Sequence, residues 1–396
     1  MNRKSVAGVK VFALAAAVAL AVAAWAPAET DMKDHHAESD LPQGPGLAAK
    51  YAMDRGIEAN PDVVFHEDFE GADLGKWGEV RKETTALTAE AADVHSGRQS
   101  CQMTATLGKD TGGSLVYWFM KNGQDKCHAR FYVKFDSEMK YLHHFCQLNA
   151  GAKQWSSFGG AGKLSKGDDN FKVVIEPCGD WGRVKPPGKW DFYCYWHEMK
   201  PDGHGDYWGN IFSPEPTVIP ELGKWICMEV MVKANAPDKH DGELGLWQDG
   251  KLIGHFKGIS LRTTAELKIN VFWLSFYVTE QTFTANKVAD PPKVSKCWFD
   301  DAVVAKSYIG PMATEQPPAD GKKDEKKDAG AQGPGAQRPA NGGDAAAAKA
   351  AQLYRDARSA ESSGLKDLGR TLYARLASEY PDSPLAAEAR RRMAGN

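Results

Sequence analysis

The chain has 396 residues, a formal net charge of −3 at pH 7 and 26% charged residues. Its length suggests about two or three folding units, and the near-neutral charge gives no overall basic field that would attract a nucleic acid. Twelve Trp, twelve Tyr and 39 Gly are typical of a β-rich protein with many turns.

The first 28 residues have the pattern of a secretory signal peptide. Three basic residues come first, an apolar run covers residues 11–25, and Ala26-Pro27-Ala28 is a cleavage site of the A-x-A kind. The apolar run is short for a membrane span. We therefore expect cleavage after residue 28, no membrane span in the mature protein, and a secreted or periplasmic location.

Residues 29–61 are polar and contain Pro and Gly, which predicts a flexible lead. Residues 62–309 contain many short alternating segments separated by turns, without a long amphipathic helix. This spacing predicts one large, mainly β domain of the sandwich or jelly-roll kind.

Residues 223–250 show the strand pattern most clearly. Ile226, Met228 and Val230 alternate with Trp225, Glu229 and Lys233, which is the period of a strand with one buried face. Asp249-Gly250 is typical of a tight hairpin turn. The outer face carries aromatic and charged residues, which favours a sheet that holds a polar, ring-shaped ligand.

The same alternation gives other strands of the main domain a polar face, with His144 assigned to the core side. If these strands share one sheet, their aromatic rings can stack on sugar rings and their cations can bind carboxylates. An ordinary solvated sheet face is the alternative, because bulky residues also favour strands. The outward residues include Arg130, Tyr132, Lys134, His143, Gln147, Lys172, Glu176, Tyr193, Tyr195, Trp273 and Tyr277.

Residues 310–346 are rich in Pro, Gly, Ala, Lys and Asp and lack aromatic residues, which predicts a disordered linker. Residues 347–396 change to a helical period. Gly369, Tyr373 and Pro381 have the spacing of a tetratricopeptide-like repeat, which this segment resembles over a single unit. One such repeat buries its own apolar face poorly, so these helices could contact a protein partner.

The seven cysteines are the last compositional clue. A secreted protein can form disulfides, and the odd number leaves at least one thiol unpaired within the chain. No C-x-x-C is present. Because several cysteines lie within strand patterns, we expect most of them to be small buried apolar residues.

Two further patterns carry a family resemblance. The opening Phe65-His66-Glu67-Asp68-Phe69-Glu70-Gly71 with Lys76-Trp77 is similar to the first strand of concanavalin A-like jelly rolls. The segments Trp190–Trp196 and Gly223–Gly250 together resemble the polysaccharide lyase 14-like group, so the resemblance covers about residues 62–309.

That resemblance implies β-elimination of a uronate-containing polysaccharide such as alginate or glucuronan, without a required cofactor. Tyr193 and Tyr195 match the family's Tyr-x-Tyr pair, which makes them the first candidates for proton transfer. We take Tyr193, Tyr195, His143 and Lys134 as the catalytic candidates. The candidates for binding the acidic polysaccharide are Arg130, Tyr132, Gln147, Lys172, Trp225, Lys233, Trp273 and Tyr277.

Two positions depart from the family pattern. Lys172-Val173-Val174 stands where the family has Ser-x-Arg, and His143-His144-Phe145 stands where it has a lysine-containing segment. A non-catalytic carbohydrate-binding module and an envelope scaffold protein are therefore the alternatives. A structural calcium ion is compatible with the fold, with oxygens from Asp300, Asp301, Asp68 or Glu70; no catalytic metal is expected.

Overall fold

The computed structural model describes residues 32–314, 350, 353, 354, 357, 366–381 and 383–394. The chain divides into two compact units, Met1–Asp320 and Gly321–Asn396. The predicted signal peptide, and all but the first residues of the predicted linker, lie outside the described residues. None of the helices that are described is long and apolar enough to cross a membrane.

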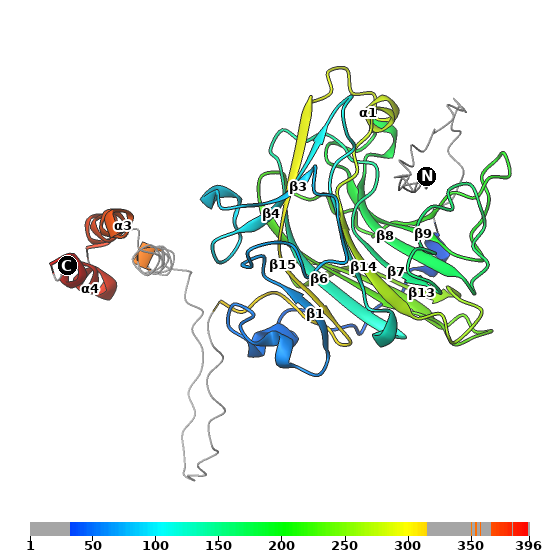
Figure 1. Cartoon of the computed structure of the whole chain (residues 1–396), viewed down its shortest axis with the longest axis horizontal. Helices are drawn as coiled ribbons and strands as arrows, with labels where there is room; N and C mark the ends of the chain where they lie inside the picture. Colours follow the sequence, from blue (N-terminus) through cyan, green and yellow to red (C-terminus); the bar gives the residue numbers. More distant parts are fainter. Residues whose placement is uncertain are drawn as a thin grey trace, which may run out of the picture. The chain divides into compact units, whose positions relative to one another are not determined.

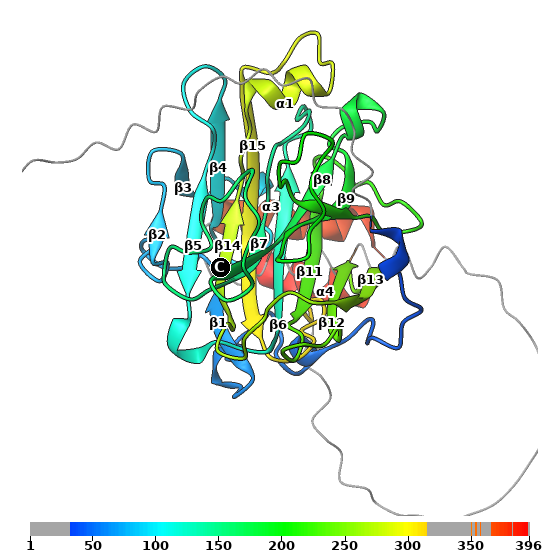
Figure 2. The ribbon, with the colours of Figure 1, turned by 90° about the vertical axis from the view of Figure 1, so that its right-hand side faces the viewer.

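The first unit is a sandwich of two antiparallel sheets, which confirms the predicted mainly β jelly-roll fold (Figure 1). Sheet A contains seven strands, in the order β10 (Asn210–Phe212), β9 (Lys189–Tyr195), β8 (Asn170–Cys178), β7 (Gln147–Gly151), β14 (Ile269–Ser275), β5 (Ser114–Trp118) and β2 (Glu79–Val80). Helix α1 (Glu280–Ala285) lies at one end of the sandwich, shortly before the last strand begins (Figure 2).

Sheet B forms the other layer, with β1 (Val63–Glu67) paired to its long last strand β15. Its other strands follow the order β13 (Lys251–Ile259), β12 (Gly242–Gln248), β11 (Trp225–Lys233), β6 (Lys126–Phe135), β15 (Val294–Ala305), β4 (Ser100–Thr106) and β3 (Thr85–Thr88). Asp249-Gly250 forms the turn between β12 and β13, where both residues have positive φ.

Aromatic residues from both sheets fill the space between them. The ring of Phe131 in sheet B lies 6.4 Å from that of Phe272 in sheet A and 5.9 Å from that of Phe299. Each of these side chains is fully buried, and each such burial contributes about 1.5–3 kcal/mol to folding. All seven cysteines are free thiols, and all but Cys178 are buried, as their positions in strand patterns predicted.

Residues 32–62 are packed on the sandwich, which differs from the flexible lead that the sequence predicted. They include the short turns η1 (Lys33–His35), η2 (Leu47–Lys50) and η3 (Ile57–Ala59). The Ala48 N–H donates to the Ile309 carbonyl at 2.8 Å, and the Trp247 indole N–H donates to the Pro42 carbonyl at 2.8 Å. The polar composition of this segment did not reveal that it is ordered, because backbone hydrogen bonds hold much of it in place. Such bonds leave no pattern in the sequence.

The second unit contains helices α3 (Lys366–Glu379) and α4 (Pro384–Ala394). They pack through an apolar cluster that includes Tyr373, Leu376 and Ala389. Pro384 begins α4, where its missing N–H costs no hydrogen bond. The helical period of this region is therefore seen in the structure, whereas its tetratricopeptide likeness stays a prediction.

Candidate functional site

The open face of sheet A, which points away from sheet B, carries side chains in rows set by the strand register. Val116, Trp273 and Gln147 are paired in succession across β5, β14 and β7. The row continues from Gln147 to Val174 and then to Tyr193. Because alternate residues of a strand point to the same face, this row and its neighbours bring polar and aromatic groups from five strands together.

Tyr193 and Tyr195 form the centre of the candidate site on β9. Their hydroxyl oxygens lie 3.3 Å apart and their rings meet edge to face at 5.4 Å. Burial raises the pKa of both phenols, and the Gly209 N–H partly opposes this shift. Raised pKa values keep both hydroxyls protonated at neutral pH, a state suited to a general acid.

His144 lies beside this pair and is held by Glu176. Its Nδ1 is 2.9 Å from a Glu176 carboxylate oxygen, and its ring stacks on that of Tyr193 with centroids 5.3 Å apart. The other side of the site is formed by Tyr277, whose ring is nearly parallel to the imidazole. With Nδ1 facing a carboxylate, Nε2 is the nitrogen left for a ligand.

Simple alternation predicted that His143 faces the site and His144 faces the core, and the structure shows the reverse. His143 is turned toward α1, with Nδ1 3.3 Å from the Thr282 hydroxyl, and burial lowers its pKa to about 3. The alternation slips because β7 begins only at Gln147 and both Phe145 and Cys146 are buried in the core. The predicted catalytic candidate His143 therefore does not line the pocket, whereas its neighbour does.

Lys172 lies opposite Tyr195 on the neighbouring strand. Its ammonium is 4.7 Å from the centre of the Tyr195 ring and donates to the Gly159 carbonyl. Burial lowers the pKa of Lys172 to about 8, against the opposing charge of Asp169. The side chain is thus a cation at neutral pH that loses its charge in mildly alkaline solution.

Gln147 presents a fixed amide to the same face. The Asn149 amide donates to Gln147 Oε1 at 2.9 Å, while Asn149 Oδ1 accepts from the Val173 N–H at 3.0 Å. Since the Gln147 oxygen is already engaged, its NH2 group is the part that can donate to a ligand.

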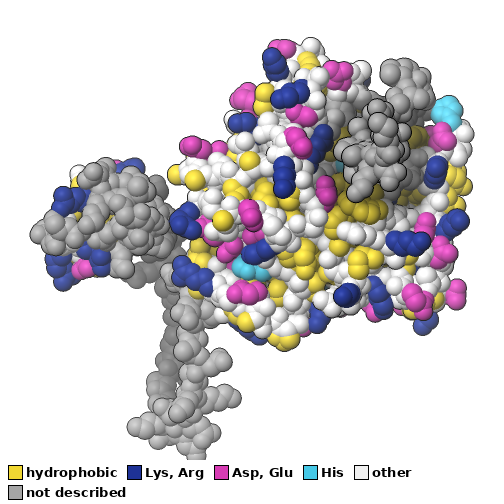
Figure 3. Space-filling model, viewed as in Figure 1, with side chains coloured by type: hydrophobic (Ala, Val, Ile, Leu, Met, Phe, Trp, Pro, Cys, Tyr) yellow, Lys and Arg dark blue, Asp and Glu magenta, His cyan; other side chains and the backbone are white. Residues whose placement is uncertain are grey.

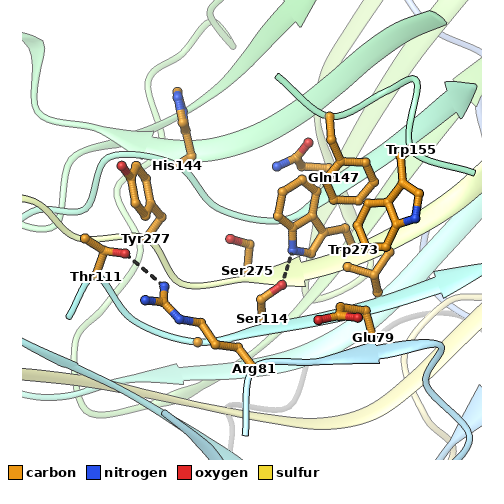
Figure 4. A pocket seen from close by; sticks show the side chains of 13 residues that line it. Glu79, Arg81, Thr111, Ser114, His144, Gln147, Trp155, Trp273, Ser275 and Tyr277 are labelled. Carbon is orange, nitrogen blue, oxygen red and sulfur yellow. Dashed lines mark hydrogen bonds between the residues drawn. The ribbon is translucent and has the colours of Figure 1, made fainter. Parts of the chain in front are cut away.

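A pocket of about 420 Å³ opens on this face beside His144 and Gln147. Trp273 forms one wall, and its indole N–H donates to the Ser114 hydroxyl at 2.7 Å (Figure 4). The ring of Phe158 stacks on the Trp273 ring with centroids 4.5 Å apart. Hydrophobic side chains gather over this part of the molecule in the space-filling view (Figure 3). The remaining lining includes Glu79, Arg81, Thr111, Trp155, Ser275 and Tyr277.

Three predicted site residues belong to the other sheet, which corrects the expectation that they share a groove with Tyr193. Arg130, Tyr132 and Lys134 lie on β6 in sheet B. Arg130 is fully buried in an ion pair with Asp54. The Tyr132 hydroxyl accepts from the Met312 N–H at 2.9 Å, and Lys134 pairs with Asp93 at 2.6 Å.

Trp225 and Lys233 are also corrected, since both lie on β11 in sheet B. Lys233 forms an ion pair with Glu243 at 2.7 Å, and Trp225 packs near His95. The polar outer face of this sheet receives the segments before β1 and after β15. Glu229, for example, accepts the backbone N–H groups of Ile309 and Gly310.

The carboxylates suggested for calcium are engaged by protein donors. Asp300 accepts from the His95 N–H at 2.9 Å, Asp301 accepts from the Ser96 hydroxyl at 2.9 Å, and Glu70 accepts from the Arg98 N–H at 2.7 Å. Among the described residues, no three His, Cys, Asp or Glu side chains gather as a metal site. These groups do not present a ligand set here, so calcium stays a prediction of the sequence.

Some pocket residues escaped the sequence-based prediction. Arg81 directly follows a two-residue strand, too short for an alternation signal, and Trp155 and Phe158 lie on the loop after β7. His144 was assigned to the core. The only available signal for Trp155 was an aromatic residue within a Ser- and Gly-rich loop. In the structure Trp155 is 51% exposed.

No protein-family model and no curated protein matches the sequence. Among solved structures, the chain is similar to alginate lyase vAL-1 from Chlorella virus, with a TM-score of 0.46 and 15% identity over 62% of this chain and 100% of that one. The endo-β-1,4-glucuronan lyase from the fungus Trichoderma reesei gives a TM-score of 0.43 and 15% identity over 64% and 100%. The marine PL-14 alginate lyase from Aplysia kurodai gives 0.43 and 12% over 62% and 97%. The sequence identity to each of these structures is 15% or less.

Proposed function

We propose that this chain is a polysaccharide lyase that cleaves a uronate-containing polymer by β-elimination. The observation that carries the proposal is the Tyr193–Tyr195 hydroxyl pair, set beside the imidazole of His144 and the ammonium of Lys172. These groups stand next to a pocket with aromatic walls, which suits the apolar faces of sugar rings.

The first chemical need is to stabilise the negative charge that develops when the uronate loses its C5 proton. The Gln147 NH2 group and the Lys172 ammonium lie on the strands between Tyr277 and the tyrosine pair and can bind the C5 carboxylate. Donors that are fixed in place before the reaction stabilise such charge most effectively. The hydrogen bond from Asn149 fixes Gln147 in this way.

The second need is a pair of groups that move protons. We assign His144 as the base that removes the C5 proton through Nε2, with Glu176 holding the ring. The C4–O4 bond then breaks, a C4=C5 double bond forms, and the leaving O4 takes a proton from Tyr195. The proton that His144 removed then returns to the tyrosine pair, whose hydroxyls share a hydrogen bond, and this restores both groups. The net change is transfer of one proton from C5 to O4, which needs no added water.

The direct test is to incubate the purified protein with a panel of polyuronates and record the ultraviolet absorbance of the unsaturated uronate product. We expect absorbance to rise with at least one polymer, and each cleavage to create one new reducing end. The proposal is wrong if no polymer containing uronate gives an unsaturated product. Such a substrate is a large extracellular polymer, so a secreted or periplasmic location is part of the proposal.

A non-catalytic carbohydrate-binding protein is the second candidate. The exposed Trp155 and the partly buried Trp273 favour it, because aromatic side chains that line a pocket bind sugars without any proton transfer. Retarded migration in gels that contain polysaccharide, with no unsaturated product, would support this candidate over the lyase.

The second unit suggests an additional protein partner. Helices α3 and α4 present a short helical pair that is separate from the sandwich in the chain. If it carries a partner contact, deletion of residues 347–396 removes co-purifying proteins and leaves polysaccharide cleavage unchanged. An unchanged set of co-purifying proteins would count against this contact.

A further inference from the structure

Arg81 is a cation in the pocket that the proposed mechanism does not use. Its Nη1 donates to the Thr111 hydroxyl at 2.9 Å, and its backbone N–H donates to the Ser114 carbonyl at 3.0 Å, which anchors it after β2. Within residues 32–314 its guanidinium has no carboxylate partner at ion-pair distance, in contrast to Arg130, Lys134 and Arg262. A guanidinium has five N–H donors, so most of them are left for a ligand.

The surroundings of Arg81 suit a sugar acid. Figure 4 shows its side chain reaching toward Thr111 on the side of the pocket where Tyr277 lies, with the indoles of Trp273 and Trp155 on the opposite side. A sugar ring can stack on the aromatic wall while its carboxylate forms paired hydrogen bonds with the guanidinium. The exposed Glu79 carboxylate also lines the pocket. Its negative charge repels the carboxylate of a bound sugar, which favours binding of that carboxylate near Arg81.

Arg81 shares the pocket with His144, the proposed base, but does not contact it. Its guanidinium donates to Thr111, whose carbonyl accepts from the Val278 N–H, and the neighbouring Tyr277 is bridged to His144, which makes two steps between neighbouring strands. At about 4.8 Å a step, this is roughly 10 Å along the sheet. One sugar residue is about as long as one step, so about two sugars separate the two positions.

We propose that Arg81 forms a second carboxylate-binding subsite, which recognises a uronate about two sugars from the cleaved bond. This inference rests on the proposed function, because His144 and the tyrosine pair define the cleaved bond. The protein then selects longer chains that carry uronate at both positions, and short uronates, which cannot reach Arg81, bind weakly.

The test measures binding by calorimetry rather than cleavage. Saturated uronate oligomers of graded length, from the disaccharide upward, are titrated into the Tyr195→Phe protein, in which the proposed acid is removed and the pocket is kept. We expect affinity to rise sharply once the oligomer reaches Arg81. Arg81→Gln in the same background should weaken the binding of the long oligomers about ten- to hundred-fold, the range for charge-assisted hydrogen bonds, and leave the disaccharide unchanged.

Two further variants complete the experiment. Arg81→Lys keeps the charge and should restore part of the affinity, whereas Arg55→Gln, which removes an exposed charge on the turn before η3, should change nothing. Equal binding of long oligomers by the Arg81→Gln protein and its parent would overturn the inference even if the protein is a lyase. Failure of the unmodified protein to form unsaturated product would instead overturn the proposed function, while the binding series would still decide whether Arg81 holds a carboxylate.

Discussion

The hydroxyl oxygens of Tyr193 and Tyr195 lie 3.3 Å apart on the open face of sheet A, and the main chain of Gly209 packs directly against the Tyr193 ring. The pair is thus held from two sides: by the strand that spaces the residues two apart and by a loop that covers one of them. Because the hydroxyls are close enough to share a proton, changes at either position should affect the same step.

Removal of one hydroxyl should therefore abolish most cleavage without loss of binding. We expect Tyr195→Phe to lower kcat about 10²- to 10⁴-fold, the usual contribution of a positioned general acid, with little change in polymer affinity. The rate is read from the absorbance of the unsaturated product. Tyr141→Phe is the control, since it removes a hydroxyl that donates to the Val184 carbonyl outside the pocket. Full activity of Tyr195→Phe would exclude the assigned role.

A methyl group at Gly209 should disturb the tyrosine pair from behind. A Cβ at this position would meet ring atoms of Tyr193 at 2.6–2.8 Å, closer than packed atoms tolerate. Gly209→Ala should therefore lower kcat at least about tenfold by shifting the ring. Gly203→Ala is the matched control, because a Cβ there meets nothing within 4 Å. Comparable kcat values for the two variants would show that the position of the Tyr193 ring does not matter.

The charge of Lys172 should set the alkaline limit of activity. Burial lowers its pKa to about 8, so kcat/KM should fall above that pH as the ammonium that binds the carboxylate becomes neutral. The pKa of Lys172 is lower in the folded protein than in the unfolded chain. The contribution of this group to folding stability therefore increases as the pH rises from about 8 to 10.4. Unfolding caused by Lys172 cannot explain a loss of kcat/KM over the same range.

The measurement is the pH profile of kcat/KM, compared with that of Lys172→Arg, whose side chain stays charged throughout. We expect the alkaline limb to move to higher pH or to disappear in this variant. An unchanged alkaline limb would assign it to another group.

Arg130 should matter for stability and not for cleavage. It is fully buried against Asp54, so Arg130→Met leaves an unpaired buried carboxylate and should destabilise the fold by about 3–5 kcal/mol. Urea unfolding measures this loss. Lys233→Met, which breaks a partly exposed pair with Glu243, should cost only about 0–1 kcal/mol. A large loss of activity in a stable Arg130→Met protein would restore Arg130 to the substrate-binding residues.

Some of the site follows from local pattern. The alternation of β9 and β14 predicted that Tyr193 and Tyr195 share a face and that Trp273 and Tyr277 share one, and the structure places all four on the open face of sheet A. Where the strand is irregular the prediction failed: the two residues Phe145 and Cys146, which precede the start of β7, moved His144 into the site and His143 out of it.

The identity of the partner strand was beyond the sequence. The pattern of β6 is as regular as that of β9, yet β6 pairs with β11 and β15 in sheet B, so Arg130 and Lys134 face packed segments of the chain. Long-range hydrogen bonding selects the partner strand, and a strand of the same period fits either layer.

The sequence by itself therefore determined a mainly β sandwich and the local faces of its regular strands, because a period of two is a property of the extended backbone. Tertiary structure alone decided which of those faces meet. It joined Lys172, Tyr193 and Tyr195 across neighbouring strands and brought Arg81 and Trp155 to one pocket, from the end of a short edge strand and from a loop. It also covered the polar face of sheet B with the segments before β1 and after β15. Contacts between residues far apart in the chain depend on strand order and loop packing, which a local pattern does not encode.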